Sequence, residues 1–406
     1  MRERNDCRCC RGTSLTAVFD LGQQPYANAF LATDQLDQPE QTSPLTLMEC
    51  ANCGHVQLQH VVDAADLYRD YSFMTSSSQR MADHFAELMR VNVGQFVGRG
   101  GLVVEVGSND GTALESITTL GVRRLGVDPA ENLCELAKRR GVTAISRFFN
   151  EQTAFDIVVD HGPADLIVAC NVMGHIDDLD DFCRGVSSLL SNHGALIIEV
   201  PDVQRLIDET EFDTIYHEHL SYFGVGAMLT LFSRHKLRVE KVEPVDVHGG
   251  SMRITVRRGK ENQSLLYPHQ PRDWQAFNWR CGTLRNNLQD WLSDQRDRKK
   301  TVWGYCAAAK ATVLLNYCGI GTEMLPVVVD STPLKIGRFM PGTHQPILSP
   351  VEVLRQMPDS VLVLAVNHFA EITRREAAYV NMGGRIVNPR YLPDGRGPSD
   401  DELEML

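Results

Sequence analysis

Short apolar runs alternate with longer, helically patterned segments between residues 100 and 198. The run LVVEV, from Leu102 to Val106, has the length and content of a buried strand, and comparable runs occur in RRLGVDP, DLIVACN and ALIIEVPD. Strands that alternate with helices are typical of a doubly wound parallel sheet. The pattern therefore predicts an α/β domain with a dinucleotide-type fold in the middle of the chain.

The segment after this domain has a different pattern. In LRVEKVEPVDVHGGSMRITVRR, two strand-like runs are joined around His248, Gly249 and Gly250. Two such runs in sequence predict an antiparallel pair. A pair of this kind is typical of one edge of a methyltransferase sheet, which distinguishes the domain from the NAD dehydrogenases.

A second α/β unit is predicted nearer the C-terminus. A helical stretch that holds Trp274, Trp279 and Trp291 leads through the charged run DQRDRKK into TVWGYCAAAK, where a strand and a helix are expected. Further apolar runs follow in LPVVVD and SVLVLAVN. We expect three parts: a head over 1–72, a central domain over 73–291 and a C-terminal domain over 292–406.

Composition and charge narrow the class of protein. A chain of 406 residues favours two or three domains, and 43% hydrophobic with 23% charged residues is typical of a globular protein. A net charge of −12 argues against a broad nucleic-acid or membrane surface, so the expected partner is a small molecule. Without a signal-peptide-like or membrane-length apolar run, a cytoplasmic location is expected. The oligomeric state is not indicated.

Five of the eleven cysteines lie within the first 53 residues. Cys7 and Cys10 form one C-x2-C pair, and Cys50 and Cys53 form another. Two thiolate pairs can hold one Zn²⁺ in a tetrahedral four-sulfur site, and in a reducing cytosol this clustering favours metal over disulfides. A closed site leaves no position for substrate, so we assign it to folding. The alternatives are unpaired cysteines, Cys9 in place of Cys10, and the weaker candidates His55 and His60.

The turn after the first strand, in LVVEVGSNDG, is rich in small and polar residues. Gly107 and Gly111 allow a ligand to approach the main chain closely, and Asp128, at the end of the second strand, is placed to grip ribose hydroxyls. Glu105 and Asp110 are negative, which fits an adenosine with a cationic sulfonium better than NAD. The residues expected to bind S-adenosylmethionine (SAM) are Glu105, Gly107, Ser108, Asn109, Asp110, Gly111, Asp128 and Asn171.

Two further segments follow strands of the same sheet and should face the cleft, NVMGHIDD and TIYHEHLSYF. The second places four proton-handling side chains in a row, from Tyr216 to His219. Histidine is the side chain whose ordinary pKa lies nearest neutrality, so a base is plausible here; the alternative is an ordinary hydrogen-bonded histidine. Phe148, Phe149 and Asn150 either border the adenine or pack in the core.

These residues identify a resemblance that runs from end to end of the chain. It resembles the sugar C-methyltransferases that act on nucleotide-linked keto-deoxysugars, as in antibiotic and surface-polysaccharide pathways. The motifs that carry it are the cysteine pairs, EVGSNDG, NVMGHIDD, TIYHEHLSYF, HGGSMR, VWGYCAAAK and VVDSTPLKIGRFMPGTH, in the family's order. The resemblance implies a zinc-binding head, a central class I methyltransferase domain of Rossmann-like fold, and a C-terminal Rossmann-like domain.

Carbon methylation of a sugar requires removal of a proton beside a ketone, so a base and an enolate stabiliser are both needed. The resemblance implies that His219 is the base and that Tyr216, Glu218 and His175 surround the reacting sugar. Tyr216 could donate to the enolate oxygen, and Glu218 could orient His219 or bind a sugar hydroxyl. The methyl transfer itself needs no metal, because it is an in-line displacement that depends on proximity.

The C-terminal domain is expected to hold the remote end of the substrate. A predicted helix N-terminus here holds the small residues Gly304, Ala307, Ala308 and Ala309, followed by Lys310. This suits a diphosphate or, equally, close packing of helix on strand. A polar loop there holds Lys335, Arg338 and His344. Family sequences often read G-Y-G-A-A-A-K where this chain has Cys306, and Trp-Asn where it has Val366 and Asn367, which leaves the substrate open.

Three other functions remain as alternatives. An O- or N-methyltransferase would keep the SAM turn but need no carbon-acid base. A C-methyltransferase could act on a keto compound that carries no nucleotide. A zinc-headed nucleotide-binding scaffold would have no use for the Y-H-E-H segment.

Overall fold

The computed structural model describes residues 1–63, 74–247, 249–259 and 272–392. The chain divides into two compact units. The core unit comprises 1–17, 47–205 and 218–271, and the C-terminal unit comprises 18–46, 206–217 and 272–406. The predicted boundary between 72 and 73, and His248 of the predicted strand pair, lie outside the described residues. The boundary at 291/292 falls inside a continuous helix, and the three domain ranges stay a prediction.

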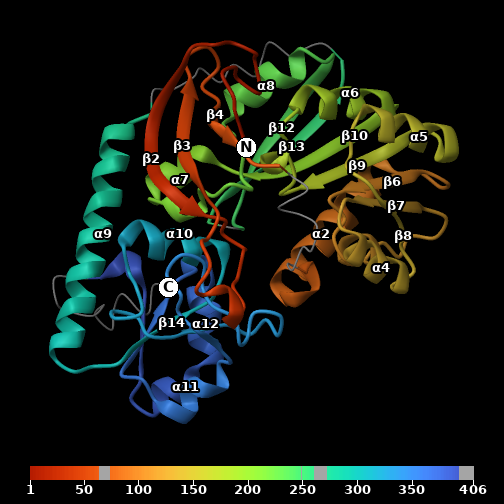
Figure 1. Cartoon of the computed structure of the whole chain (residues 1–406). Coiled ribbons are helices and arrows are strands. Elements are labelled where there is room, and N and C mark those ends of the chain that lie inside the picture. Colours follow the sequence, from red (N-terminus) through yellow and green to blue (C-terminus); the bar gives the residue numbers. More distant parts are fainter. Residues whose placement is uncertain (64–73, 248, 260–271, 393–406) are drawn as a thin grey trace. The chain divides into compact units, whose positions relative to one another are not determined.

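The core unit contains the predicted central sheet, with helices on both of its faces (Figure 1). Its sheet strands are β6 (Leu102–Val106), β7 (Arg123–Asp128), β8 (Thr143–Ser146), β9 (Ala164–Cys170), β10 (Leu190–Pro201), β12 (Leu237–Val245) and β13 (Ser251–Arg258). Its helices are α2 (Gln79–Phe96), α3 (Thr112–Glu115), α4 (Glu131–Arg139), α5 (Glu151–His161), α6 (Leu179–Leu189), α7 (Val203–Asp208, which continues into the C-terminal unit) and α8 (Val225–Ser233).

The seven strands lie in the order β12-β13-β10-β9-β6-β7-β8. Strands β6 to β10 are parallel, and β12 and β13 form an antiparallel pair at one edge. This order confirms both the doubly wound sheet and the edge pair predicted from the sequence. The carboxyl ends of β6, β7, β9 and β10 therefore lie along one edge, where open α/β sheets bind ligands.

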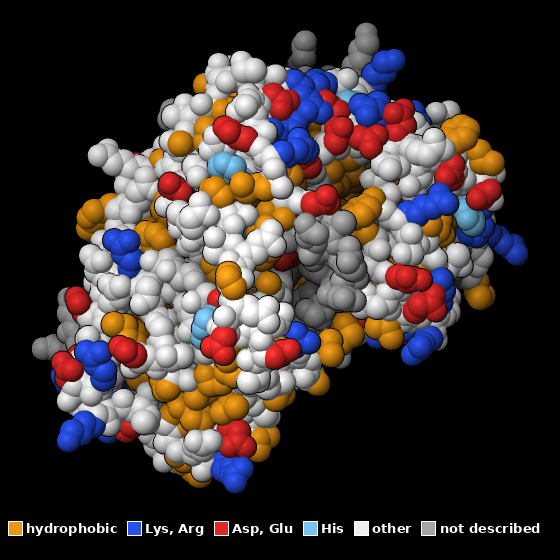
Figure 2. Space-filling view, viewed as in Figure 1, with side chains coloured by type: hydrophobic (Ala, Val, Ile, Leu, Met, Phe, Trp, Pro, Cys, Tyr) orange, Lys and Arg blue, Asp and Glu red, His pale blue; other side chains and the backbone are white. Residues whose placement is uncertain are grey.

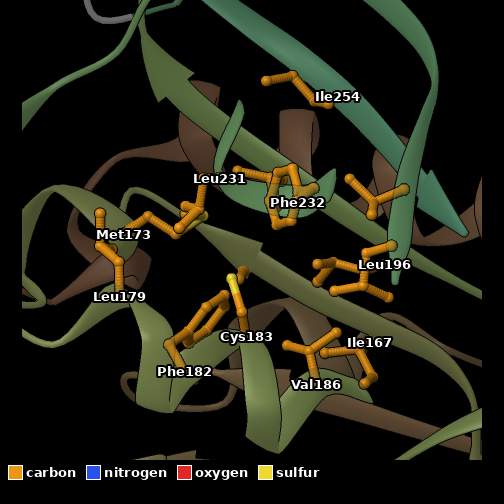
Figure 3. Packing of buried hydrophobic residues seen from close by; sticks show 14 of the residues in the cluster. Ile167, Met173, Leu179, Phe182, Cys183, Val186, Leu196, Leu231, Phe232 and Ile254 are labelled. Carbon is orange, nitrogen blue, oxygen red and sulfur yellow. The ribbon is translucent and has the colours of Figure 1, made fainter. Parts of the chain in front are cut away.

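Alternation along the central strands builds the two apolar layers. In β6, Leu102, Val104 and Val106 face one layer and Val103 faces the other. The first layer is covered by α5, α6 and α8, and the second by α2, α3 and α4. Figure 3 shows Phe182 and Val186 of α6 packed with Phe232 of α8 and with side chains of the sheet. Strands buried on both faces explain their nearly continuous apolar sequences.

The head is built from short strands in the first 61 residues. These are β1 (Arg2–Glu3), β2 (Leu15–Pro25), β3 (Thr42–Cys50), β4 (Val56–Leu58) and β5 (His60–Val61). Strand β1 pairs with β5, and the other three join β11 (Ser221–Tyr222) in a sheet ordered β11-β4-β3-β2. Because β11 follows the Y-H-E-H segment directly, that segment is attached to the head by main-chain pairing.

The C-terminal unit has its own parallel sheet, ordered β16-β15-β14-β17-β18. Its strands are β14 (Val302–Tyr305), β15 (Val328–Val329), β16 (Ile347–Leu348), β17 (Ser360–Val363) and β18 (Arg385–Val387), and its helices are α9 (Trp274–Asp297), α10 (Ala309–Cys318), α11 (Val351–Gln356), α12 (Phe369–Arg375) and α13 (Ala377–Asn381). An all-parallel sheet with reversal of strand order beside β14 is Rossmann-like, as expected. Within the described part of the chain, no helix combines the length and apolar content of a membrane span.

Candidate active site and metal centre

The four predicted zinc ligands lie together in the head. The sulfur atoms of Cys7, Cys10, Cys50 and Cys53 are all within 4.8 Å of one another. The Cys7–Cys53 and Cys10–Cys50 sulfur distances are 3.6 and 3.5 Å, close to the roughly 3.8 Å edge of a tetrahedron with Zn–S bonds of about 2.3 Å. The hydrogen bond between Cys53 and Cys7 lowers the pKa of Cys7 and raises the pKa of Cys53, so these two sulfur atoms share one proton when no metal is bound. The donor set fits one Zn²⁺.

The alternative ligands lie elsewhere. Cys9 is fully buried but does not belong to the four-sulfur cluster. The Nε2 atom of His55 lies 3.2 Å from the Ser221 hydroxyl, and the main chain of His60 pairs with Glu3 in the β1–β5 ladder. The cluster is thus formed by the two C-x2-C pairs.

Arginines of the head hold an acidic loop of the core. Asp177, just after His175, forms ion pairs with Arg2, Arg4 and Arg8; its carboxylate lies 2.9 Å from Arg4 Nη1 and 3.0 Å from Arg8 Nε. Figure 2 shows basic and acidic side chains gathered together on the upper part of this face, near α6 and α8. The head is therefore joined to the rest of the core unit through charge as well as through strand pairing.

A second acidic residue, Asp180 in the first turn of α6, reinforces this junction. Its carboxylate accepts from Arg11 at 2.6 Å, from Arg234 at 2.7 Å and from His235 at 2.7 Å. Desolvation acts to raise the pKa of Asp180, but these bonds outweigh it and hold the pKa well below its usual range.

The glycine-rich turn lies directly after β6, as predicted. Gly107 has a φ of +70°, and a Cβ there would lie 2.3 Å from Val172 Cγ2. Gly111, with a φ of +79°, is the N-cap of α3. Both positions need glycine for conformation and for space, since a Cβ at Gly111 would lie 2.9 Å from Ala137 Cβ. The turn leaves main chain rather than side chains at the end of β6, which is what close approach by a ligand requires.

Asp128 lies at the end of β7 beside this turn. Its carboxylate accepts from the main-chain amides of Asn109 and Ala130, both at 2.9 Å. Desolvation nevertheless raises its pKa. A carboxylate fixed by amides at this position can still offer lone pairs to ribose hydroxyls.

Glu105, the residue before the last of β6, is a buried carboxyl whose surroundings bear on which cofactor the turn can hold. It is only 7% exposed, and its Oε2 atom has no hydrogen-bond partner among the described residues. Desolvation, and then the charges of Asp128 and Asp110, raise the pKa of Glu105 well above its usual range. A bound cation would favour the charged form of this buried carboxyl, whereas an anionic pyrophosphate would disfavour it. The site therefore fits the sulfonium and ammonium of SAM.

The remaining predicted cofactor residues lie at the same edge. Asn171 follows β9 with a φ of +55°, and its amide donates to the Glu199 carbonyl at 2.8 Å. Ser108 is buried and its hydroxyl has no partner among the described residues. Phe149 packs against Phe182 with ring centroids 5.5 Å apart, and Asn150 caps α5, whereas Phe148 is exposed. Phe149 and Asn150 therefore have structural contacts of their own.

Sequence reasoning missed a loop that lies against the turn. The amide of Thr75 donates to Asn109 Oδ1 at 3.0 Å, and the amide of Ser76 donates to Asp110 Oδ2 at 3.3 Å. The run T-S-S-S-Q is typical of a helix N-cap, and the Ser78 side chain accepts a hydrogen bond from the main-chain amide of Met81 at the start of α2. Nothing in that pattern shows that the loop contacts the turn, because the contact is made by main-chain amides.

A charged network at the end of β10 was also not predicted from the sequence. Glu199 is fully buried, and its carboxylate binds His84 at 2.7 Å and Arg253 at 2.6 Å. These bonds, against the opposing effect of desolvation, lower its pKa. The available signal was an acidic residue inside the apolar strand ALIIEV, since a buried carboxylate is normally paired.

The two predicted active-site histidines of the core unit lie together. The rings of His175 and His219 meet edge to face with centroids 4.9 Å apart. The amide of Leu220 donates to the Gly174 carbonyl at 2.7 Å, so the two loops are also joined through their main chains. Desolvation lowers the pKa of His175 to about 4, although a hydrogen bond to the main chain of Glu218 acts in the opposite direction. Burial therefore favours the neutral ring, whose one N–H serves the main chain of Glu218 and whose other nitrogen can accept a hydrogen bond.

The other residues of the Y-H-E-H segment have distinct surroundings. Glu218 is buried and belongs to the core unit with His219. His217 belongs to the C-terminal unit, where its Nε2 atom lies 3.1 Å from the Ser43 carbonyl and its ring packs on Tyr26. Tyr216 precedes it in the same unit and is partly exposed. The contacts of His217 are those of a structural residue.

Family models match three stretches of the chain, under the descriptions "Putative zinc binding domain" (7–68), "Methyltransferase domain" (79–242) and "C-methyltransferase C-terminal domain" (246–390). A curated relative, C-methyltransferase NovU of Streptomyces niveus, is 33% identical over 98% of this chain and 97% of its own length. The chain belongs to this C-methyltransferase family. It is a SAM-dependent C-methyltransferase with a zinc-binding head, as the sequence indicated.

Part of the chain is also similar to solved structures of other methyltransferases. A SAM-dependent methyltransferase from Clostridium acetobutylicum is 14% identical, covering 44% of this chain and 90% of its own, with a TM-score of 0.34. Magnesium protoporphyrin IX methyltransferase from Synechocystis, with bound SAH, is also 14% identical, covering 45% and 83%, with a TM-score of 0.35.

The C-terminal unit of the methyltransferase brings some of its predicted polar residues together. Lys335 Nζ donates to the Ala307 carbonyl at 2.8 Å and lies 3.7 Å from Asp330. It therefore sits beside the turn between β14 and α10. Lys310, the first basic residue of α10, lies 3.9 Å from Glu211.

Two other predicted residues of that unit are engaged elsewhere. Arg338 donates to the Phe30 carbonyl at 3.3 Å, and His344 Nε2 lies 2.5 Å from Glu40. Neither contact is with the β14–α10 turn. Cys306, where family sequences often have glycine, has a φ of +75°, a conformation that costs a non-glycine residue about 1–2 kcal/mol.

Proposed function

We propose that the methyltransferase acts on a nucleotide-linked keto-deoxysugar and places the methyl group on the carbon beside its ketone. The observation that carries the proposal is the pairing of His175 with His219 in the unit that holds the SAM turn. A C-methyltransferase needs a carbon nucleophile, and a ketone supplies one once an adjacent proton is removed. The end-to-end resemblance of the sequence to the sugar C-methyltransferases supports the choice of sugar.

His219 is the proposed base. Its imidazole takes the proton from the carbon beside the ketone, and the electron pair of that C–H bond forms the enolate. Tyr216 is the proposed donor for the enolate oxygen, and His175, which burial keeps neutral, lies beside His219 at the reacting sugar. Glu218 orients His219 or binds a sugar hydroxyl.

Glu105, Asp128 and the glycine turn hold the cofactor. When bound, SAM supplies a methyl group on a cationic sulfonium. The chain's part is to hold the enolate carbon in line with that methyl and to exclude water. The enolate electron pair would form the new C–C bond as the S–CH3 bond breaks, with the electron pair of that bond staying on sulfur in the departing thioether, and His219 later returns its proton to solvent.

The C-terminal unit is proposed to hold the nucleotide end of the substrate. The turn before α10, with Lys335 beside Ala307, offers helix amides and one cation to a diphosphate. The domain limits at 72/73 and 291/292, and the cytoplasmic location, belong to the same proposal.

A mass-spectrometric screen tests the proposal. The protein is incubated with SAM and a panel of nucleoside-diphosphate-linked 4-keto-6-deoxysugars, with the matching free keto sugars in parallel. Only the nucleotide-linked sugars are expected to give a product about 14 mass units heavier, the mass of one added CH2. The NMR spectrum of this product should show a C–CH3 group. An O–CH3 product, or equal turnover of the free sugars, would replace the proposal with one of its alternatives.

A further inference from the structure

Arg8 lies inside the zinc knuckle, between Cys7 and Cys10, and its side chain is fully buried. Its Nε donates to Asp177 at 3.0 Å, and its Nη1 donates to the Leu58 carbonyl at 2.9 Å. Its main-chain amide donates to Gln57 Oε1 at 2.8 Å. The guanidinium thus connects a loop of the methyl-transfer core with strand β4 of the head.

Both of those partners lead to an active-site histidine. Asp177 is two residues after His175. Leu58 donates its amide to the Leu220 carbonyl at 3.0 Å, and Leu220 is the neighbour of His219. Arg8 is therefore bonded on one side to the His175 loop and on the other to the strand that carries the His219 segment.

The main chain closes these contacts into a ring. The Leu220 amide donates to the Gly174 carbonyl at 2.7 Å, and Gly174 is covalently joined to His175. The ring runs from Arg8 through Leu58, Leu220 and the loop of Gly174 to Asp177, and returns to Arg8. Arg4 and Arg2 also contact Asp177, but neither bonds to Leu58.

Stability alone does not explain an arginine at this position. Its Nη2 atom has no partner among the described residues, and burying a charge with an unsatisfied donor is costly. Well-packed apolar residues often replace buried ion pairs without loss of stability. The geometry instead matches the way outer residues fix the orientation of groups that do chemistry.

We infer that Arg8 is a positioning residue, through which the zinc-bound knuckle holds the His175 and His219 loops in register for proton abstraction. The inference rests on the proposed function for its chemical consequence, but not for its structural one. The zinc site, which cannot bind substrate itself, acquires through Arg8 a direct influence on the active site.

The test compares Arg8→Gln with Arg11→Gln. Arg11 also joins the head to the acidic residues around α6, but its contacts are with Asp6, Asp178 and Asp180. Zinc content and the Kd for SAM are measured first in both variants. Both quantities are expected to match those of the wild type within about twofold.

The structural readout is amide hydrogen exchange of the peptide that contains Leu220. Protection there reports the bonds of β11 and of Gly174. Arg8→Gln is expected to exchange at least about tenfold faster, and Arg11→Gln at the wild-type rate. Unchanged protection in Arg8→Gln would overturn the inference, whatever the protein's substrate.

The chemical readout is exchange of the substrate's α-proton into D2O with SAH in place of SAM. Because a misplacement of about 1 Å can cost roughly 100-fold in rate, Arg8→Gln is expected to lose between ten- and a hundredfold in this exchange and in kcat, with little change in KM. Arg8→Lys, which keeps a charge for Asp177, is expected to recover part of the loss. Faster amide exchange with unaltered α-proton exchange would show that Arg8 holds the two loops without affecting proton abstraction, and would overturn the inference. Absence of α-proton exchange in the wild-type protein would instead refute the proposed function.

If Arg8→Gln loses its zinc, the same measurements are made on Asp177→Asn. Asp177 is partly exposed and lies outside the knuckle, so the metal site remains intact. It is expected to give the same two losses in smaller measure. Wild-type protection and wild-type kcat in Asp177→Asn would equally overturn the inference.

Discussion

The imidazole rings of His175 and His219 meet edge to face, 4.9 Å between centroids, although 43 residues separate them in the chain. Each follows a strand of the same sheet, β9 for His175 and β10 for the segment of His219. Parallel strands bring their carboxyl ends to one edge, and this explains why NVMGHIDD and TIYHEHLSYF converge.

Replacing His219 tests the proposed base. His219→Ala is expected to lower kcat by about 100- to 10,000-fold, the usual contribution of a general base. The Kd for SAM should stay within about threefold, because the predicted cofactor residues lie in or directly after β6, β7 and β9 and none belongs to the His219 segment. His193→Ala, which removes an exposed histidine of the same unit, is the control and should retain full activity. An active His219→Ala enzyme would require another base.

The sequence predicted the core sheet well because its strands are buried on both faces. Leu102 to Val106 and Ala164 to Cys170 occur where the apolar runs were found, and the edge pair was visible as two runs around Gly249. The cysteine spacings likewise predicted the cluster that forms. Such features depend on local pattern, which a single sequence records directly.

The contacts missed were those that depend on main-chain atoms or on pairing between distant segments. The amide of Thr75 binds Asn109, and no side chain marks that role. The partners of Arg8 and Glu199 lie far away in sequence, so their burial could not be read from neighbours. Closeness in sequence can also mislead. His217 is two residues from His219, but its ring lies against the Ser43 carbonyl and has different surroundings.

Glycine at position 107 is expected to be essential to the cofactor turn. In Gly107→Ala, the left-handed conformation costs about 1–2 kcal/mol, and contact of the new Cβ with Val172 adds an overpacking cost of about 1–3 kcal/mol. The Kd for SAM should rise at least about tenfold, the equivalent of 1.4 kcal/mol, measured by calorimetry.

Gly141→Ala is the matched control for this change. Gly141 has a φ of +76°, close to that of Gly107, but a Cβ there has nothing within 4 Å. Gly141→Ala should be destabilised only by the cost of the left-handed conformation, and its Kd for SAM should equal that of the wild type. Equal SAM binding by the two variants would show that the turn does not approach the cofactor closely.

One pair of variants distinguishes the predicted zinc ligand Cys10 from its neighbour Cys9. Cys10→Ala is expected to lower zinc content from about one atom per chain to a small fraction of that, since a four-sulfur site loses a ligand. Cys9→Ala should keep its zinc, because Cys9 lies outside the cluster. Elemental analysis of freshly purified protein provides the measurement. Zinc retained by Cys10→Ala but lost from Cys9→Ala would exchange their assignments.

The buried carboxyl of Glu105 predicts a pH dependence of the protein without SAM. Its pKa is raised in the folded state, so its favourable contribution to stability is complete below the ordinary value of 4.5 and is lost as pH rises through the raised pKa. Glu105→Gln removes that loss. The variant should therefore melt at a higher temperature than wild type at neutral and alkaline pH, with the difference shrinking toward pH 4.5.

Binding of SAM should reverse the order of the two proteins. A cation beside Glu105 favours its charged form, so SAM is expected to stabilise wild type more than Glu105→Gln, and the Kd should rise about tenfold or more in the variant, as for a lost charged hydrogen bond of about 1.5–3 kcal/mol. Glu115→Gln, which neutralises an exposed carboxyl paired with Arg140, is the control and should change neither property. If Glu105→Gln bound SAM with wild-type affinity at every pH, the carboxyl would have no part in holding the sulfonium, and its burial would need another explanation.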